Sequence, residues 1–178
     1  MKNLFKSIII LIMIFCLDTF VLGRNIYNVS EYDIKAAFVY NFLKFIKLKN
    51  EVHKNFIILC VYCPEDIRSS FKKLDGKKIE SKIIKVEFYK NINNNIPNCD
   101  VLFLHHDILN NKQLDFLKKN NKNILSISDQ KDFIKHGGII ELFTQNNKIR
   151  FKINLISAKK AKIKISSRLL ELAKEIIK

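Results

Sequence analysis

An amphipathic pattern begins at Ser30, after which apolar residues recur at spacings of three and four. The apolar positions are Ile34, Ala37, Phe38, Phe42, Phe45 and Ile46. This spacing is typical of a helix with one buried face, and the Ser30 hydroxyl can accept a hydrogen bond from a free N–H group of the first turn. We therefore predict a helix from Ser30 to about Leu48.

The rest of the chain alternates between apolar runs and amphipathic segments. Most runs predict buried strands, and one of them alternates in polarity and predicts a strand with a wetter face. The predicted strands are 56–63, 82–89, 100–106, 123–128, 139–143 and 149–156, and the predicted helices are 64–74, 111–120, 131–136 and 166–178. Strands separated by helices indicate a single α/β domain, with a mostly parallel mixed sheet flanked by helices and an antiparallel hairpin near the C-terminus.

Turn-forming residues set the boundaries of these elements. We expect Asp75-Gly76 to end the second helix, and Gly137-Gly138 to end the short helix that Asp129 would cap. Asn146-Asn147 lies at the turn of the hairpin. An Asn-rich stretch at 91–98 predicts a polar loop.

The first residues have the layout of an export signal. Two lysines precede an apolar run from Ile8 to Leu17, and the small residue Gly23 follows. A membrane-spanning helix needs about 20 apolar residues, whereas Asp18 interrupts this run. We therefore predict a cleaved signal peptide at 1–23, followed by one domain at 24–178.

Composition adds a strong positive charge. The 178 residues carry a formal net charge of +15, and 28 of the 32 positive residues are Lys. Lys, Asn and Ile together make up 76 residues, and all three have AT-rich codons, so codon composition accounts for part of the charge. The densest cluster, at 159–164, has no stacking aromatic residues between its lysines. We interpret it as a solvated face and predict no nucleic-acid partner.

Several enzyme classes are excluded by missing motifs. Beyond the predicted signal peptide the glycines are Gly76, Gly137 and Gly138, so neither a P-loop nor a dinucleotide-binding fingerprint can form. Common hydrolase motifs are absent as well. We therefore predict that the protein is neither a nucleotide-binding enzyme nor a common hydrolase and that it uses no cofactor.

Histidines form the main candidate for a metal site. His105, His106 and Asp107 lie at the end of a predicted strand, and His136 precedes the double glycine. Adjacent residues of a strand point to opposite faces, so only one of His105 and His106 is expected to face a shared site. No closed ligand set with a known spacing is visible, and we predict no metal site.

Export would place three cysteines, Cys60, Cys63 and Cys99, in an oxidising compartment. One disulfide and one spare thiol are the default expectation. The Cys60-x-x-Cys63 spacing, between a strand and the start of a helix, is also that of a periplasmic thiol-disulfide oxidoreductase. Cys60 lies inside the apolar run, and neither Trp nor Gly flanks the pair. We favour structural pairing and keep redox catalysis as the alternative.

The C-terminal third of the chain contains a series of motifs, in which a double glycine leads into a hairpin, then a Phe-x-Ile-Asn step and a Ser-Ser-x-Leu-Leu helix. The residues that carry this pattern are Gly137, Gly138, Phe151, Ile153, Asn154, Ser166, Ser167, Leu169, Leu170 and Ala173. The pattern resembles that of the YfiR-like family of periplasmic proteins. With the first helix and two buried strands, the resemblance covers nearly all of 31–177.

The resemblance implies an exported α/β protein that regulates rather than catalyses. Characterised members bind the periplasmic part of an inner-membrane diguanylate cyclase and hold it inactive, which lowers cyclic-di-GMP signalling. An outer-membrane lipoprotein can sequester them, and a homodimer is a further candidate assembly. The resemblance also implies that Cys60 pairs with Cys99, which leaves Cys63 spare. Closing this loop of about 40 residues would stabilise the fold by about 4 kcal/mol.

The sequence departs from the family pattern at three places, one of which is Cys63, where Gly is common. Leu48-Lys49 stands where Trp-Pro is usual, and Lys152 stands between Phe151 and Ile153 where an acidic residue is usual. If the C-terminal hairpin and helix form the contact surface, a charge reversal at Lys152 changes the accepted partner more readily than the fold. The other family residues are interpreted mainly as folding residues.

Overall fold

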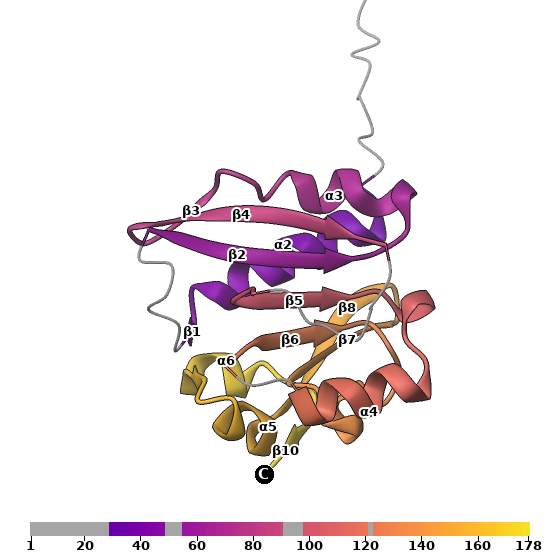
Figure 1. Ribbon diagram of the computed structural model, residues 1–178. Helices are drawn as coiled ribbons and strands as arrows, with labels where there is room; N and C mark the ends of the chain where they lie inside the picture. The colour runs from indigo at the N-terminus through magenta and orange to yellow at the C-terminus, as the bar shows by residue number, and fades with distance from the viewer. Residues whose placement is uncertain (1–28, 49–54, 91–97, 121–122) are drawn as a thin grey trace, which may run out of the picture.

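The computed structural model describes residues 29–48, 55–90, 98–120 and 123–178 (Figure 1). The predicted signal peptide and almost all of the Asn-rich loop lie outside these residues. Within them, no helix is long and apolar enough to cross a membrane. In chain order the elements are α2 (Glu31–Leu43), β1 (Ile46–Lys47), β2 (Phe56–Tyr62), η1 (Glu65–Ile67), α3 (Arg68–Lys72), β3 (Lys78–Ile79), β4 (Lys82–Tyr89), β5 (Val101–Leu104), η2 (His106–Ile108), α4 (Asn111–Asn120), β6 (Leu125–Ser128), η3 (Phe133–His136), β7 (Ile140–Gln145), β8 (Lys148–Asn154), α5 (Leu155–Lys160), β9 (Lys164–Ile165), α6 (Ser167–Glu171) and β10 (Ile176–Ile177).

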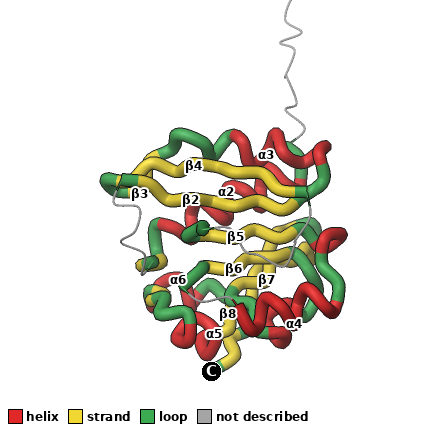
Figure 2. Tube along the Cα trace, in the orientation of Figure 1, coloured by secondary structure: helices red, strands yellow, loops and turns green. Residues whose placement is uncertain are grey.

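An eight-stranded sheet forms the centre of the molecule, in the order β10-β8-β7-β6-β5-β2-β4-β3 (Figure 2). Its β2–β4, β2–β5, β5–β6, β6–β7 and β8–β10 pairs are parallel. The β3–β4 and β7–β8 pairs are antiparallel, and β1 and β9 form a separate two-stranded sheet. The predicted α/β class, with a mostly parallel sheet and a hairpin near the C-terminus, is confirmed.

Strand β2 shows how both faces of the sheet are filled. Leu59 and Val61 belong to one core cluster and Cys60 and Tyr62 to another, as the two-residue period of a strand requires. The first cluster also holds side chains of α2, α3, α5 and α6, and the second holds side chains of α4. Helices therefore cover both faces, which explains why β2 is a continuous apolar run.

The first helix begins where the sequence predicts and ends earlier. The Ser30 hydroxyl accepts a hydrogen bond from the Asp33 N–H at 3.0 Å, and the Asp33 carboxylate accepts one from the Ser30 N–H, so the two residues form a capping box. The helix ends at Leu43 instead of near Leu48. The reason is a tertiary one, because the following residues form β1 and pair with β9.

The predicted final helix at 166–178 is wrong beyond its first turns. Ser166 caps α6 as expected, but α6 ends at Glu171. Ile176–Ile177 then forms β10, which pairs in parallel with the edge of β8. The N–H and C=O groups at the edge of β8, which is distant in the sequence, pair with β10. These hydrogen bonds outweigh the helical preference of the segment.

Helix α5 was not predicted, and it shortens the predicted strand at 149–156. The Asn154 side-chain carbonyl accepts a hydrogen bond from the Ser157 N–H at 2.8 Å, which caps α5 and ends β8. The Asn154 amide group donates to the buried Ile134 carbonyl at 2.7 Å. Asn154 therefore joins the hairpin to η3 as well as starting a helix.

Residues with positive φ make the turns around the hairpin. Gly137 has φ 92° and ends η3, as the sequence predicts. Asn146 and Asn147 have φ 52° and 55° and connect β7 to β8, in the left-handed conformation that a two-residue hairpin turn needs. The prediction that Asp129 caps the η3 turn is wrong, because Asp132 occupies that position.

Candidate functional site

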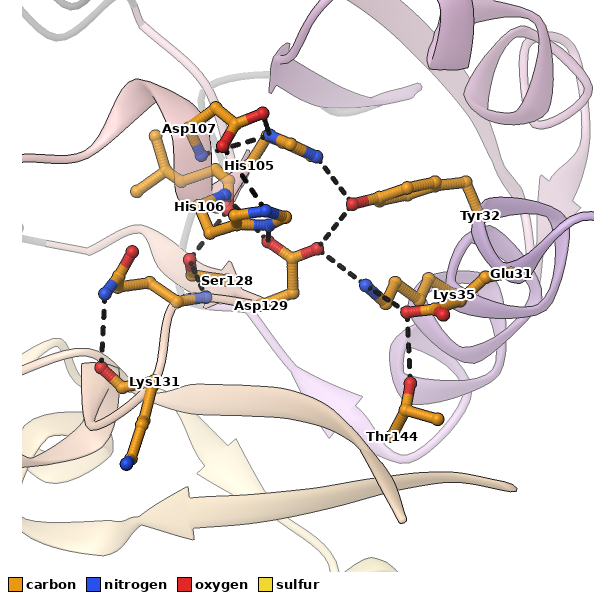
Figure 3. A network of polar contacts seen from close by, with 12 residues as sticks. Glu31, Tyr32, Lys35, His105, His106, Asp107, Ser128, Asp129, Lys131 and Thr144 are labelled. Carbon is orange, nitrogen blue, oxygen red and sulfur yellow. Dashed lines mark hydrogen bonds and ion pairs between the residues drawn. The ribbon is translucent and has the colours of Figure 1, made fainter. Parts of the chain in front are cut away.

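Polar side chains gather at the carboxyl edge of the parallel strands β5 and β6 (Figure 3). His105 follows β5 and Asp129 follows β6, and the two strand ends are in register. Helix α2 brings Tyr32 and Lys35 to the same place. These four residues and His106 are called the carboxyl-edge network. Ligands of open α/β sheets bind outside this edge of the strands.

A buried ion pair forms the base of the network. The Lys35 Nζ lies 2.6 Å from the Asp129 Oδ2, and the two side chains are 4% and 2% exposed. Lys35 also contacts the half-exposed Glu31 at 2.8 Å. Burial alone would raise the pKa of Asp129, but the hydrogen bond and positive charge of Lys35 outweigh it and hold that pKa below its usual value. Asp129 is therefore a carboxylate that burial does not neutralise.

A second branch of the network runs from His105 through Tyr32 to Asp129. The Asp107 N–H donates to the His105 Nδ1 at 3.1 Å, so Nδ1 carries the lone pair and Nε2 the proton. The Nε2 faces the Tyr32 hydroxyl at 2.5 Å, and that hydroxyl donates to the Asp129 Oδ2 at 3.0 Å. Burial lowers the pKa of His105 and raises that of Tyr32, so both side chains are neutral at pH 7.

His106 is the part of the network that reaches solvent, with a side chain that is 48% exposed. Its Nδ1 lies 3.3 Å from the Asp129 Oδ1, and its Nε2 lies 3.3 Å from a carboxylate oxygen of Asp107. Its backbone N–H donates to the Asp129 Oδ1 at 2.8 Å. Its ring lies 4.1 Å from that of His105, centroid to centroid.

The sequence-based expectation that His105 and His106 point to opposite faces is wrong. Strand β5 ends at Leu104, before either histidine, and His106 already belongs to the 3-10 helix η2. The tighter turn brings both rings to Asp129. His136 does not join them, because its Nδ1 contacts the Asp132 carbonyl on η3.

Lys35, Tyr32 and Asp129 were missed as site residues, and little in the sequence could have revealed them. Lys35 is one of 28 lysines, and its burial depends on the packing of α2 against the sheet. The available signal was the position of Asp129 directly after a buried strand.

The three cysteines considered above lie in two different core clusters. Cys60 and Cys99 belong to the same core cluster, where their thiols are in hydrogen-bonding contact, and this contact and burial raise the pKa of Cys60. Cys63 lies in the cluster on the opposite face of the sheet, and burial raises its pKa to about 11. All three are free thiols in this structure.

The predicted motif residues of the C-terminal region do not form one polar site. Phe151 and Ile153 are buried in the core. Lys152 lies 3.2 Å from the buried Glu141, its partner across the β7–β8 pair, and 3.5 Å from Glu175. Gly137, Asn154 and Ser166 have the structural roles given above, and Gly138 packs against the Phe133 ring. Ser167 is exposed, and Leu170 packs partly against the core.

An apolar groove of about 270 Å³ lies between α2 and the segment at the end of α6, and is called the α2–α6 groove. Phe42 and Phe151 meet edge to face in it, with ring centroids 5.0 Å apart. Leu172 stands at its rim and is 65% exposed. The groove is lined by Phe38, Asn41, Phe42, Phe45, Phe151, Leu169 and Leu172.

These features define a mixed α/β domain with a polar network at the carboxyl edge of its sheet and an apolar groove beside its first helix. The chain belongs to the YfiR/HmsC-like family, because the model of that family, described as DUF4154, matches residues 32–174. A comparison with curated proteins gives no significant match.

Solved structures similar to the chain include the following two. A conserved domain protein from Vibrio cholerae O1 biovar eltor str. N16961 has 12% identity and a TM-score of 0.52, over 83% of this chain and 60% of that one. The ABC domain in complex with L-Trp from Streptococcus pneumonia has 10% identity and a TM-score of 0.45, over 69% of this chain and 56% of that one. The first likeness supports the fold, and this chain spans 60% of the length of that protein.

Proposed function

We propose that this protein is exported to the periplasm, binds the periplasmic part of an inner-membrane diguanylate cyclase and lowers its synthesis of cyclic-di-GMP. The observation that carries the proposal is the family match over 32–174, which supports a periplasmic regulator of a diguanylate cyclase in general terms. An outer-membrane lipoprotein that sequesters the regulator, and a homodimer, belong to the same proposal.

The α2–α6 groove is the surface that best suits such a partner. It combines partly buried aromatic side chains with the exposed Leu172, and Phe151 of the family motif forms part of its floor. Apolar pockets that take a side chain of a partner supply much of the binding energy of protein interfaces. We therefore assign the cyclase contact to this groove. We do not assign it to Lys152, because the Lys152 ammonium group already forms ion pairs with Glu141 and Glu175.

A matched pair of substitutions tests the groove. Leu172→Asp places a charge at its rim, and Ile156→Asp places one on α5, at a residue that is 43% exposed and does not line the groove. Both changes affect exposed positions and should leave thermal unfolding nearly unchanged. We expect Leu172→Asp to weaken binding to the periplasmic part of the cyclase by at least about tenfold and to raise cellular cyclic-di-GMP. If the Leu172→Asp variant represses the cyclase as strongly as the wild-type protein does, the assignment is contradicted.

We further propose that Cys60 and Cys99 form a disulfide in the exported protein. The Asp100 N–H donates to the Ile58 carbonyl at 3.0 Å, which holds Cys99 beside β2, and both sulfurs lie in one buried cluster. Peptide mapping without reductant, after alkylation of free thiols in the unfolded protein, should recover a Cys60–Cys99 link and an alkylated Cys63.

The alternative function, a thiol-disulfide oxidoreductase that uses Cys60 and Cys63, has less support. The two residues lie on opposite faces of the sheet, and the pKa of each thiol is raised, whereas reactive thiols have lowered values. A dominant Cys60–Cys63 link that mild thiols reduce would favour this alternative over the regulator.

A further inference from the structure

The carboxyl-edge network contains donor atoms that the proposed regulation does not use. One ligand atom each from His105, His106 and Asp129 lie within 4.8 Å of one another. We propose that these three side chains bind a divalent transition-metal cation of the zinc type, with the fourth coordination position open to solvent. The inference stands apart from the proposed function, because it rests on this geometry alone.

Two of the donors already have the spacing of metal ligands. The His106 Nδ1 and the Asp129 Oδ1 are 3.3 Å apart. Two ligands bound to one tetrahedral zinc at about 2.0–2.1 Å are separated by about 3.3–3.4 Å. The separation of these two atoms therefore already matches that of two ligands on one cation.

His105 keeps a lone pair at Nδ1, while its other ring nitrogen is held in a hydrogen bond. Its Nε2 carries the proton and faces the Tyr32 hydroxyl, so its Nδ1 is the donor. Histidine ligands usually hold their other ring N–H in a hydrogen bond of this kind. The cation would replace the Asp107 N–H at Nδ1, and a shift on the order of 1 Å would bring the three donors into one coordination sphere.

Asp129 is also held in the manner of a metal ligand. Its Oδ2 accepts from Lys35 and Tyr32, which fixes the carboxylate and leaves Oδ1 directed at His106. The Lys35 ammonium opposes a second cation, whereas the exposed carboxylate of Asp107 beside both rings attracts one. Two imidazoles and one carboxylate favour zinc, copper or nickel over magnesium or calcium.

The open fourth position would face solvent at His106. The His105 and Asp129 side chains are nearly inaccessible, and His106 is the half-exposed member of the set. Three protein ligands with one open position are typical of zinc sites that bind a further molecule, whereas structural zinc sites have four protein ligands.

The test uses the full exported chain without a histidine tag, freed of metal by chelation. Isothermal titration with zinc chloride should show one cation per chain, and magnesium chloride should show none. His106→Ala should weaken zinc binding by at least about tenfold, while His136→Ala, which removes an exposed histidine outside the network, should leave it unchanged. Cobalt should give the visible absorption bands of a low-coordinate nitrogen and oxygen site.

His106 is the informative position, because its side chain is half-exposed and its loss should not prevent folding. Asp129→Asn would remove the carboxylate charge but also disturbs a buried ion pair, so it is a secondary variant. The proposal is overturned if the wild-type protein shows no saturable zinc binding, or if His106→Ala binds zinc as tightly as His136→Ala does.

Discussion

Replacing Lys35 by Met should destabilise the protein severely, because it leaves a carboxylate buried without its ion-pair partner. Methionine retains most of the apolar stem of lysine and removes the ammonium group that lies 2.6 Å from the Asp129 Oδ2. The Asp129 side chain is 2% exposed and gains almost no water in exchange. The remaining hydrogen bonds to Asp129 come from the Tyr32 hydroxyl and the His106 N–H.

Two physical limits give the size of the effect. Removing one partner of a buried ion pair costs about 3–5 kcal/mol. Asp129 can instead take up a proton, and at pH 7 a carboxyl group with a usual pKa of 3.8 does so at a cost of about 4 kcal/mol. Since its two remaining donors still stabilise the charge, we expect a loss of about 3 kcal/mol from the free energy of unfolding.

Urea unfolding at pH 7, with a chelator present, measures this loss. The matched control is Lys73→Met, because Lys73 lies 2.6 Å from Asp33 but is 62% exposed. An exposed pair contributes less than about 1 kcal/mol. Lys35→Met and Asp129→Asn should also be coupled by about 2 kcal/mol in a double-mutant cycle. The reasoning is refuted if the Lys35 and Lys73 variants lose equal stability.

Three further predictions concern packing, charge and thiol reactivity. Gly138→Ala should cost about 2 kcal/mol, because the new Cβ would lie 2.2 Å from the buried Phe133 ring, and an unchanged urea midpoint would argue against it. Lys152→Glu should cost about 3 kcal/mol, because it leaves the buried Glu141 facing a like charge; unaltered thermal unfolding would contradict this. Cys63, with a pKa raised to about 11, should react with iodoacetamide at pH 8 at least about 100-fold more slowly than a free thiol. Rapid labelling of the folded protein, followed by mass spectrometry, would disprove that.

The sequence determined the features that depend on near neighbours along the chain. The Ser30 helix cap, the strand at 82–89 and the Asn146-Asn147 turn form as predicted. Each of them follows from side chains a few residues apart, through capping, hydrophobic period or preference for positive φ. The α/β class follows from the same local signals, because alternating strands and helices leave few arrangements of the sheet.

Only the tertiary structure decided where the first and last helices end and which side chains form the carboxyl-edge network. The two-residue strands β1 and β10 exist because distant edges offer hydrogen-bond partners, which outweigh a weak helical preference. Lys35 and Asp129 are 94 residues apart, and each belongs to a common residue type. Their pairing depends on burial by the whole fold. What sets Lys35 apart from the exposed lysines is that the residues packed around it exclude water.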